Sequence, residues 1–334
     1  MGENLKSNGE EYGGIKDMKI SVALCSYNGE KYIEQQLNSI LNQSVSIDEI
    51  IVCDDGSTDN TVDIVKRVLS EASVSYRIEI NEQSLGVAKN FLKALKLTTG
   101  QYVFTCDQDD VWNIDKVKTF LCEAERTKKD LYFSNGNLID SDGNALGNTL
   151  WEAYGIYYNV IIRSSLIHTL VKKTLATGAA MMVSRELIDM INSIPENWLH
   201  DEWFAIVAAL KNSMQPINSL TFDYRQHGKN VVGAKKRTFL EKMNVWLSNY
   251  KNLNQIRGNN YARSCAVSSV AQNTEYAEIT TRSRQFWETL VNLPNLSRIK
   301  GFFVVLKMFL RGEYSVFYTG IRGFIRDIIS VLFF

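Results

Sequence analysis

Three carboxylates crowd the end of a short apolar stretch at residues 102–112, which read YVFTCDQDDVW. Asp107, Asp109 and Asp110 repel one another unless a cation neutralises their charge. Carboxylate oxygens are the ligands that Mg²⁺ and Mn²⁺ prefer, and either cation would in turn bind a diphosphate. The alternative is an Asp-rich surface turn, because Asp side chains often cap turns and helices.

A second acidic turn lies at residues 50–61, which read IIVCDDGSTDNT. Here an apolar stretch ends in Asp54 and Asp55, and Gly56 permits a sharp turn into the helix that follows. Both acidic turns therefore follow an expected strand and precede an expected helix. This pattern predicts that the two turns meet at one edge of a parallel sheet, where open α/β sheets bind ligands.

Strands and helices alternate along the first part of the chain. Expected strands cover residues 19–25, 48–53, 75–81 and 102–106, and expected helices cover 31–42, 60–70, 87–97 and 115–128. This alternation predicts an α/β fold with a Rossmann-like, mostly parallel sheet flanked by helices. Later elements are expected as a strand near 131–135, a loop region over 134–158, a helix over 159–173 and a strand over 177–183.

Several motifs, in this order, resemble those of glycosyltransferase family 2. Its nucleotide-sugar half is similar to ISVALCSYNGEKYIEQQLNSILNQ, VCDDGSTDNT, NEQSLGVAKNF and CDQDDVW; its acceptor half is similar to ATGAAMMVSREL, LHDEWFAIVAAL and YRQHGKNVVG. The resemblance covers roughly residues 19–233 and is strongest to the bacterial polysaccharide subgroup of rhamnosyltransferases. It implies an inverting, metal-dependent enzyme with the glycosyltransferase A-type fold.

The resemblance also implies roles for residues of the nucleotide-sugar half. Ser26 and Tyr27 would line the base pocket. Asp54 and Asp55 would hydrogen-bond the base or the ribose, since a carboxylate at a strand end can accept from an imide N–H or from hydroxyls. Lys89 would face the nucleotide. The alternatives are a helix cap for Asp55 and a solvated helix face for Lys89.

The resemblance implies that residues from two motifs, CDQDDVW and YRQHGKNVVG, bind one cation, Mg²⁺ or Mn²⁺. Asp107 would contact the ribose or the metal shell, and Asp109 would coordinate the cation directly. The cation would stabilise the departing nucleotide diphosphate as a Lewis acid. His227 matches a position that can supply an imidazole ligand, and Arg225 could neutralise a leaving phosphate. A packed His227 that binds no metal is an open alternative.

The expected catalytic base is Asp201 in the segment LHDEWFAIVAAL. Inverting transfer needs one carboxylate to take the proton of the acceptor hydroxyl as the new glycosidic bond forms. Relatives commonly carry Glu-Asp where this chain has His200 and Asp201, which leaves the aspartate in place and makes Glu202 the less favoured base. The alternative for Asp201 is a cap of the helix that follows.

The charge distribution divides the chain near residues 234–238. From Lys235 onward the chain contains 15 Lys and Arg residues but only 6 Asp and Glu residues. The part before Lys235 contains 22 Lys and Arg residues and 31 Asp and Glu residues. A basic tail therefore follows an acidic domain. The expected organisation is a disordered leader over 1–17, a catalytic domain over 18–234 with halves at 18–130 and 131–234, and a helical tail over 235–334.

Apolar and basic residues alternate at helical spacing in two segments of this tail, LSRIKGFFVVLKMFLRG and YTGIRGFIRDIISVLFF. Neither segment contains about 18 uninterrupted apolar residues, so neither is expected to span a bilayer. Amphipathic helices lying in the membrane interface are favoured. The alternative is a helical hairpin packed on the enzyme or across a homodimer.

The predicted function is transfer of a sugar, L-rhamnose from dTDP-rhamnose, to a polysaccharide or lipid-linked oligosaccharide in cell-surface glycan synthesis. The alternatives are a UDP-hexose-dependent hexosyltransferase and a non-catalytic scaffold that binds nucleotide. The polar first 17 residues and five cysteines without paired spacing indicate a cytoplasmic protein. The amphipathic tail predicts that it is peripheral on the inner face of the cytoplasmic membrane. No nucleic-acid partner is expected.

Overall fold

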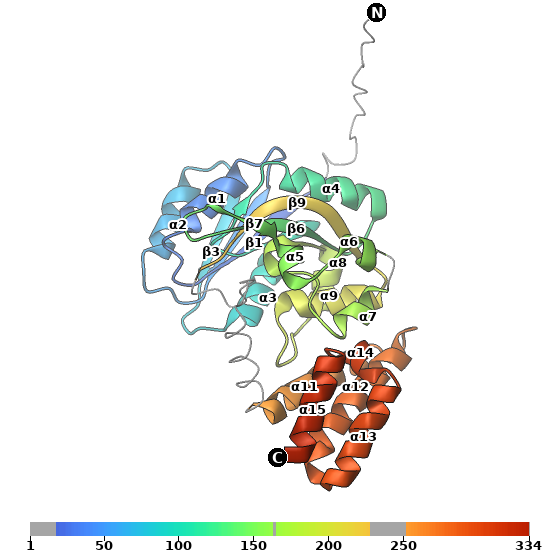
Figure 1. Cartoon of the computed structure of the whole chain (residues 1–334). Helices are drawn as coiled ribbons and strands as arrows, with labels where there is room; N and C mark the ends of the chain where they lie inside the picture. The colour runs from blue at the N-terminus through green and yellow to red at the C-terminus, as the bar shows by residue number, and fades with distance from the viewer. Residues whose placement is uncertain (1–17, 163–164, 228–251, 334) are drawn as a thin grey trace, which may run out of the picture.

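The computed structural model describes residues 18–162, 165–227 and 252–333 (Figure 1). The expected boundary at 234–238 and the expected leader lie outside these residues. The described residues form a nine-stranded sheet in the order β3-β2-β1-β4-β8-β6-β9-β5, with β7 paired to β6. Helices cover the sheet, and a helical bundle follows it in the chain.

The first half of the sheet is parallel, as predicted. It contains β1 (Ile20–Ser26), β2 (Glu49–Asp54), β3 (Ser75–Ile80) and β4 (Tyr102–Cys106). The helices between and after them are α1 (Ile33–Leu41), α2 (Thr61–Ser70), α3 (Val87–Leu97) and α4 (Lys116–Thr127). Every residue of β1, β2 and β4 is buried, because helices cover both faces of these strands. The expected α/β fold is confirmed.

The second half of the sheet is mixed. It contains β5 (Val111–Trp112), β6 (Leu131–Ile139), β7 (Ala145–Thr149), β8 (Met181–Ser184) and β9 (Met214–Arg225). β8 runs antiparallel to both β4 and β6, whereas β9 runs parallel to β6 and antiparallel to β5. β9 was not predicted, because its register against β6 shifts and its buried positions do not alternate strictly.

Three expectations for this region were wrong. Residues 134–158 are not a loop region, because a turn with Gly143 at φ +92° joins β6 to β7, and α5 (Leu150–Tyr154) follows. In place of one helix over 159–173 there are α6 (Tyr158–Ile161) and α7 (Leu166–Leu170), since Ser165 is extended. The strand expected from 177 begins only at Met181, because Gly178–Ala180 form a 3₁₀ turn.

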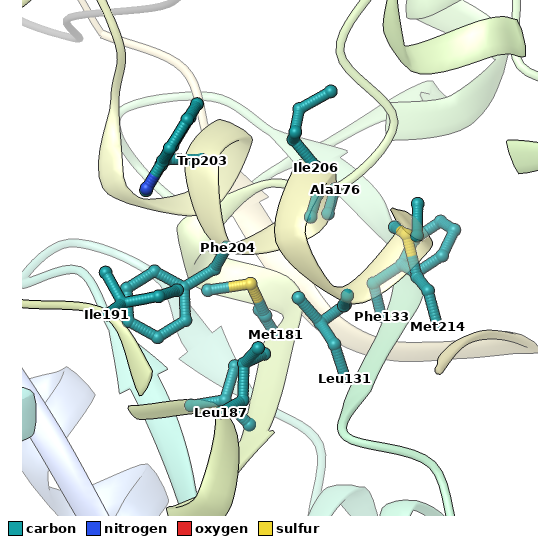
Figure 2. Packing of buried hydrophobic residues seen from close by; sticks show 14 of the residues in the cluster. Leu131, Phe133, Ala176, Met181, Leu187, Ile191, Trp203, Phe204, Ile206 and Met214 are labelled. Atoms are coloured by element: carbon teal, nitrogen blue, oxygen red, sulfur yellow. The ribbon is translucent and has the colours of Figure 1, made fainter. Parts of the chain in front are cut away.

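The buried side chains form one apolar layer on each face of the sheet. One layer packs β6 and β8 against α8 (Arg185–Met190) and α9 (His200–Leu210). Figure 2 shows part of it, with Leu131 and Met181 of the sheet close to Phe204 of α9. The other layer lies under α1, α2 and α4. Each layer fixes a helix whose end contributes to the cavity described below.

The C-terminal helices form a bundle of α11 (Leu253–Val270), α12 (Ala277–Asn292), α13 (Arg298–Leu310), α14 (Glu313–Phe317) and α15 (Ile321–Phe333), coloured orange to red in Figure 1. The bundle has its own apolar core, and a buried ion pair joins Arg257 Nη2 to Asp327 Oδ1 at 2.7 Å. Among the helices that the structure describes, none combines the length and apolar character needed to traverse a bilayer.

Candidate active site

A cavity of about 1060 Å³ lies at the carboxyl ends of β1, β2 and β4. Segments from both halves of the catalytic domain line it, including the start of α3, the acidic loop after β4 and the start of α9. The predicted site residues that line it are Ser26, Tyr27, Asp55, Asp107, Asp109, Asp201 and His227. The predicted residues Asp54, Lys89 and Arg225 are not among the lining residues.

Asp54 is buried and holds the ends of two strands together. Its Oδ2 accepts from Ser26 Oγ at 2.7 Å and from Ser57 Oγ at 2.6 Å. Its Oδ1 accepts from the backbone N–H of Ser57 at 2.7 Å. Asp54 therefore stabilises the turn between β2 and α2 and does not line the cavity.

Asp55 fixes the loop that leads into α3. Its carboxylate accepts from Ser84 Oγ at 2.6 Å, Leu85 N at 2.7 Å, Asn81 Nδ2 at 2.8 Å and Gly86 N at 3.0 Å. Burial alone would raise the pKa of Asp55, but these hydrogen bonds lower it. Asp55 is therefore ionised at neutral pH and lines the cavity as a fixed negative charge.

Lys89 is exposed on α3, whereas its neighbour Asn90 is buried and lines the cavity. Asn90 Nδ2 donates to the carbonyl oxygen of Cys53 at 2.8 Å, and Asn90 Oδ1 accepts from Asn81 Nδ2 at 2.8 Å. Asn81 and Asn90 thus connect β2 to α3. The sequence signal for both residues was the motif NEQSLGVAKNF, which begins at Asn81 and contains Asn90.

The acidic loop after β4 contains two carboxyl groups, Asp107 and Asp110, whose pKa values are raised. Burial, together with the charges of Asp109 and Asp201, raises the pKa of Asp107 to about 7. Burial and the charges of Asp109 and Asp107 raise the pKa of Asp110 well above its usual value. Its Oδ2 is buried and has no hydrogen-bond partner. The buried Lys116 lies nearby, but burial lowers its pKa to about 7.

Asp109 and His227 meet beside this loop. Asp109 Oδ2 lies 2.7 Å from His227 Nε2, and the ring of His227 stacks on Tyr32 with centroids 5.2 Å apart. Arg225 is buried behind them. Its Nε donates to the carbonyl oxygen of Asp109 at 2.8 Å, and its backbone N–H donates to Asp110 Oδ1 at 3.0 Å. Arg225 therefore positions the acidic loop, and its contacts are with the protein.

A divalent cation fits these side chains. Among the described residues, no three His, Cys, Asp or Glu side chains are already arranged as a metal cage. Mg²⁺ commonly binds through one or two carboxylates plus substrate phosphates, so a complete cage of protein ligands is not required. Asp109 and His227 supply ligand atoms for such a cation, whose charge would relieve the repulsion that raises the pKa values of Asp107 and Asp110.

Asp201 lines the same cavity from the first turn of α9. Its Oδ2 accepts from the backbone N–H of Gly178 at 2.9 Å, and its Oδ1 accepts from that of Glu202 at 2.8 Å. Burial and the charge of Glu202 raise the pKa of Asp201 to about 7. A carboxylate with a pKa near neutral pH suits a general base. The hydrogen bond from the Glu202 N–H shows that Asp201 also contacts the start of the helix.

His200 packs beneath Gly178. Its ring stacks on Phe91 with centroids 3.8 Å apart, neither ring nitrogen has a hydrogen-bond partner, and burial lowers its pKa to about 3. A Cβ at position 178 would lie 2.6 Å from His200 Nε2. A glycine there therefore lets the backbone N–H reach Asp201. The small residues of ATGAA were the sequence signal for this close approach.

The family model of glycosyl transferase family 2 matches residues 21–190. The chain is a family 2 glycosyltransferase. This match covers half of the chain and includes the acidic loop after β4 as well as Gly178. The expected family membership and enzyme class are confirmed.

Curated relatives of this glycosyltransferase include two bacterial enzymes. The dTDP-rhamnosyl transferase RfbG of Shigella flexneri is 30% identical over 226 residues, which cover 63% of this chain and 74% of RfbG. WfgD of Escherichia coli, a UDP-Glc:α-D-GlcNAc-diphosphoundecaprenol β-1,3-glucosyltransferase, is 28% identical over 45% of this chain. The chain spans 57% of the length of WfgD.

Two solved structures resemble the fold of this glycosyltransferase. TarS residues 1–349 of S. aureus, in complex with UDP-GlcNAc, have a TM-score of 0.58 at 18% identity and cover 94% of this chain and 80% of that one. The mannosyltransferase PcManGT of Pyrobaculum calidifontis, in complex with GDP-Man and Mn²⁺, has a TM-score of 0.53 at 15% identity and covers 95% and 87%. The expected glycosyltransferase A-type fold is confirmed.

Proposed function

We propose that this glycosyltransferase transfers a sugar with inversion from a nucleotide-sugar donor to a glycan or lipid-linked acceptor of the cell surface. The carrying observation is that one cavity holds both the acidic loop with Asp109 and, at the start of α9, Asp201 with its raised pKa. The donor diphosphate would lie at the loop and the acceptor hydroxyl at Asp201. A sugar bound between them could be attacked from the side opposite its leaving group.

Asp201 would perform the proton transfer. Its ionised carboxylate accepts the acceptor hydroxyl proton while the oxygen forms a bond to the anomeric carbon and the bond to the diphosphate breaks. Asp109 and His227 would hold Mg²⁺ or Mn²⁺, which supplies Lewis-acid stabilisation of the diphosphate when it is bound. Tyr27 and Asp55 line the part of the cavity assigned to the nucleotide.

The donor proposed is dTDP-rhamnose. RfbG supports it, because RfbG is named a dTDP-rhamnosyl transferase and aligns with the larger share of this chain. A UDP-hexose is the second candidate donor, supported by WfgD, which is named as a UDP-Glc-dependent enzyme. The two donors differ in nucleotide as well as in sugar, so nucleotide binding alone separates them.

Thermal stabilisation by nucleotides tests this proposal. We expect dTDP with Mn²⁺ to raise the melting temperature of the full chain more than UDP or GDP does, because at equal concentration the ligand that binds the native state more tightly stabilises it more. Rhamnose transfer from dTDP-rhamnose should then be measurable with a glycan acceptor. A larger shift with UDP would favour the hexosyltransferase, and binding without turnover of any donor would favour a non-catalytic scaffold.

The proposal includes peripheral binding to the membrane through the outer face of α13 and α15. Ile299, Phe303 and Leu310 are 73%, 62% and 75% exposed, and their spacing places them on one side of α13, opposite its buried side. Ile321 and Ile325 begin a similar exposed row on α15. Side chains of the two helices pack together between these rows.

Basic side chains accompany these apolar rows. Lys300 and Lys307 of α13, Arg311 directly after it and Arg322 of α15 are exposed. An apolar face with adjacent Lys and Arg is complementary to an anionic lipid surface, because the apolar groups enter the headgroup boundary while the cations contact phosphates. We name the exposed residues Ile299, Phe303, Leu310, Ile321, Ile325 and Leu332 the outer apolar face.

Charging the outer apolar face should release the enzyme from lipid. We expect the double substitution of Phe303→Asp and Leu310→Asp to reduce partition into phosphatidylglycerol vesicles by at least about 10-fold, because both side chains lose apolar burial. Val270→Asp, at an exposed position of α11, is the matched control. Equal partition of wild type and double variant would refute the lipid proposal, and a simultaneous loss of dimer mass would indicate a homodimer interface.

A further inference from the structure

Arg263 of α11 reaches from the C-terminal bundle to the catalytic domain. Its Nη1 and Nη2 donate to the two carboxylate oxygens of Glu202 at 2.9 and 3.0 Å. Nη1 also donates to the carbonyl oxygen of Asn197 at 2.8 Å, and the guanidinium lies 3.8 Å from the ring centroid of Trp198. A bidentate contact of this kind fixes both partners in one orientation.

Glu202 makes further contacts at the start of α9. Thr174 Oγ1 donates to its Oε1 at 2.6 Å, and the backbone N–H of Leu199 donates to its Oε2 at 3.2 Å. Its side chain is only 12% exposed. Burial alone would raise the pKa of Glu202, but the hydrogen bond and the charge of Arg263 lower it. An ionised, largely buried carboxylate thus depends on one arginine of another structural unit.

This contact lies one residue from the proposed base. The carboxylate of Asp201 is held by the backbone N–H groups of Glu202 and Gly178, so its place depends on the first turn of α9. A second cavity, of about 250 Å³, lies between the catalytic domain and the bundle. The two cavities share Lys173, Thr174 and Glu202 as lining residues. The bundle therefore supports the rear of the wall that carries Asp201.

We propose that Arg263 is a positioning residue through which the C-terminal bundle holds the first turn of α9, and with it the Asp201 carboxylate, in the geometry for transfer. The inference rests on the proposed function of Asp201 as the base. It gives the C-terminal helices a role in turnover that is independent of any membrane contact. Lysine cannot replace the arginine, because an ammonium group cannot form the bidentate contact.

Arg263 also neutralises the negative charge of Glu202, which lies next to Asp201 in the chain. The titratable groups that face Asp201 are Glu202 and His200 of its own helix, Tyr154 of α5 and Asp107 after β4. The charge of Glu202 already contributes to the raised pKa of Asp201. Removing the guanidinium would leave that negative charge without its partner. The pKa of Asp201 should then rise further, and the acid limb of the kcat profile should move to higher pH.

The test compares Arg263→Gln and Arg263→Lys with the wild-type full chain. We expect both variants to lose kcat by about 10-fold or more, since small displacements of a catalytic group are costly. The melting shift given by nucleotide and Mn²⁺ should stay unchanged. The acid limb should move upward in Arg263→Gln. Adding Glu202→Gln should return that limb toward its wild-type position, because the uncompensated charge is removed. Arg67→Gln, which breaks an exposed pair with Glu34, is the matched control.

The outcomes separate this inference from the proposed function. Wild-type kcat and an unmoved acid limb in both Arg263 variants would overturn the inference, provided that Asp201→Asn is inactive in the same assay. If Asp201→Asn transfers at the wild-type rate, the proposed base itself is wrong. A folded Arg263 variant that loses nucleotide stabilisation along with kcat would also overturn the inference, because the residue would then act on the donor side.

Discussion

Replacement of Asp201 by Asn should lower sugar transfer by at least about 100-fold, the usual effect of removing a general base. The amide keeps the shape of the side chain and can still accept from the Gly178 N–H, but it cannot take up the acceptor proton. Nucleotide affinity should stay near the wild-type value, because the Asp201 carboxylate is held by the N–H groups of Gly178 and Glu202 and, within the described residues, makes no hydrogen bond to the loops assigned to the nucleotide. Transfer rate and nucleotide-induced melting shift are measured on the same preparation.

The pH dependence of the wild-type enzyme supplies a second readout of Asp201. Only the ionised carboxylate can act as a base, and burial together with the charge of Glu202 raises its pKa to about 7. We therefore expect kcat to fall by about tenfold per pH unit as the pH drops below 7, because the protonated fraction grows. Above pH 7 the carboxylate is ionised, and kcat should no longer depend on its protonation.

Asp189→Asn is the control for this experiment, since Asp189 is exposed at the end of α8. It should leave both the transfer rate and the pH profile unchanged. Near wild-type transfer by Asp201→Asn would reduce Asp201 to a contact of the helix start. Loss of nucleotide binding in that variant would instead place Asp201 on the donor side of the cavity.

Replacement of Asp109 by Asn should abolish stimulation of turnover by Mn²⁺ while the protein still folds. The neutral amide preserves the side-chain shape but removes the charge that would hold the cation beside His227. The extra melting shift that Mn²⁺ adds to a nucleotide diphosphate should disappear as well. This second measurement reports cation binding independently of turnover.

The matched control is Asp63→Asn, at an exposed position in the first turn of α2. It carries the same change of charge but lies outside the cavity, so the Mn²⁺ response should persist. A wild-type Mn²⁺ response in Asp109→Asn would remove Asp109 from the set of ligands. Asp110, whose Oδ2 has no hydrogen-bond partner among the described residues, would then be the next carboxylate to replace.

Sequence patterns predicted the parallel half of the sheet well, because its strands are short apolar runs separated by amphipathic helices. In α1, for example, Ile33, Leu37 and Ile40 are buried at helical spacing. The patterns failed at β9, where register shifts against β6 disturb the alternation that identifies a strand. They also failed at Ser165, whose extended backbone separates two short helices.

The site shows a similar division. Motifs identified Asp55, Asp109 and Asp201 as residues of one site, and the structure brings all three to one cavity. The contacts that hold them come from residues without a distinctive local pattern. Asn81 contacts Asp55, and Arg263, from the helical tail whose two later segments were expected at the membrane, contacts the neighbour of Asp201. Such partners depend on tertiary packing, which local spacing does not encode.

The pairing of β5 with β9 determines when the acidic loop can be completed. The loop lies between β4 and β5, but Arg225, which donates to the Asp109 carbonyl oxygen, follows 116 residues later in the chain. During synthesis from the N-terminus, β1 to β4 leave the ribosome well before β9 is made. A nascent chain can therefore form its parallel sheet while the loop proposed to bind diphosphate still lacks its support. The support of the acidic loop is therefore completed late in assembly, when β9 joins the sheet.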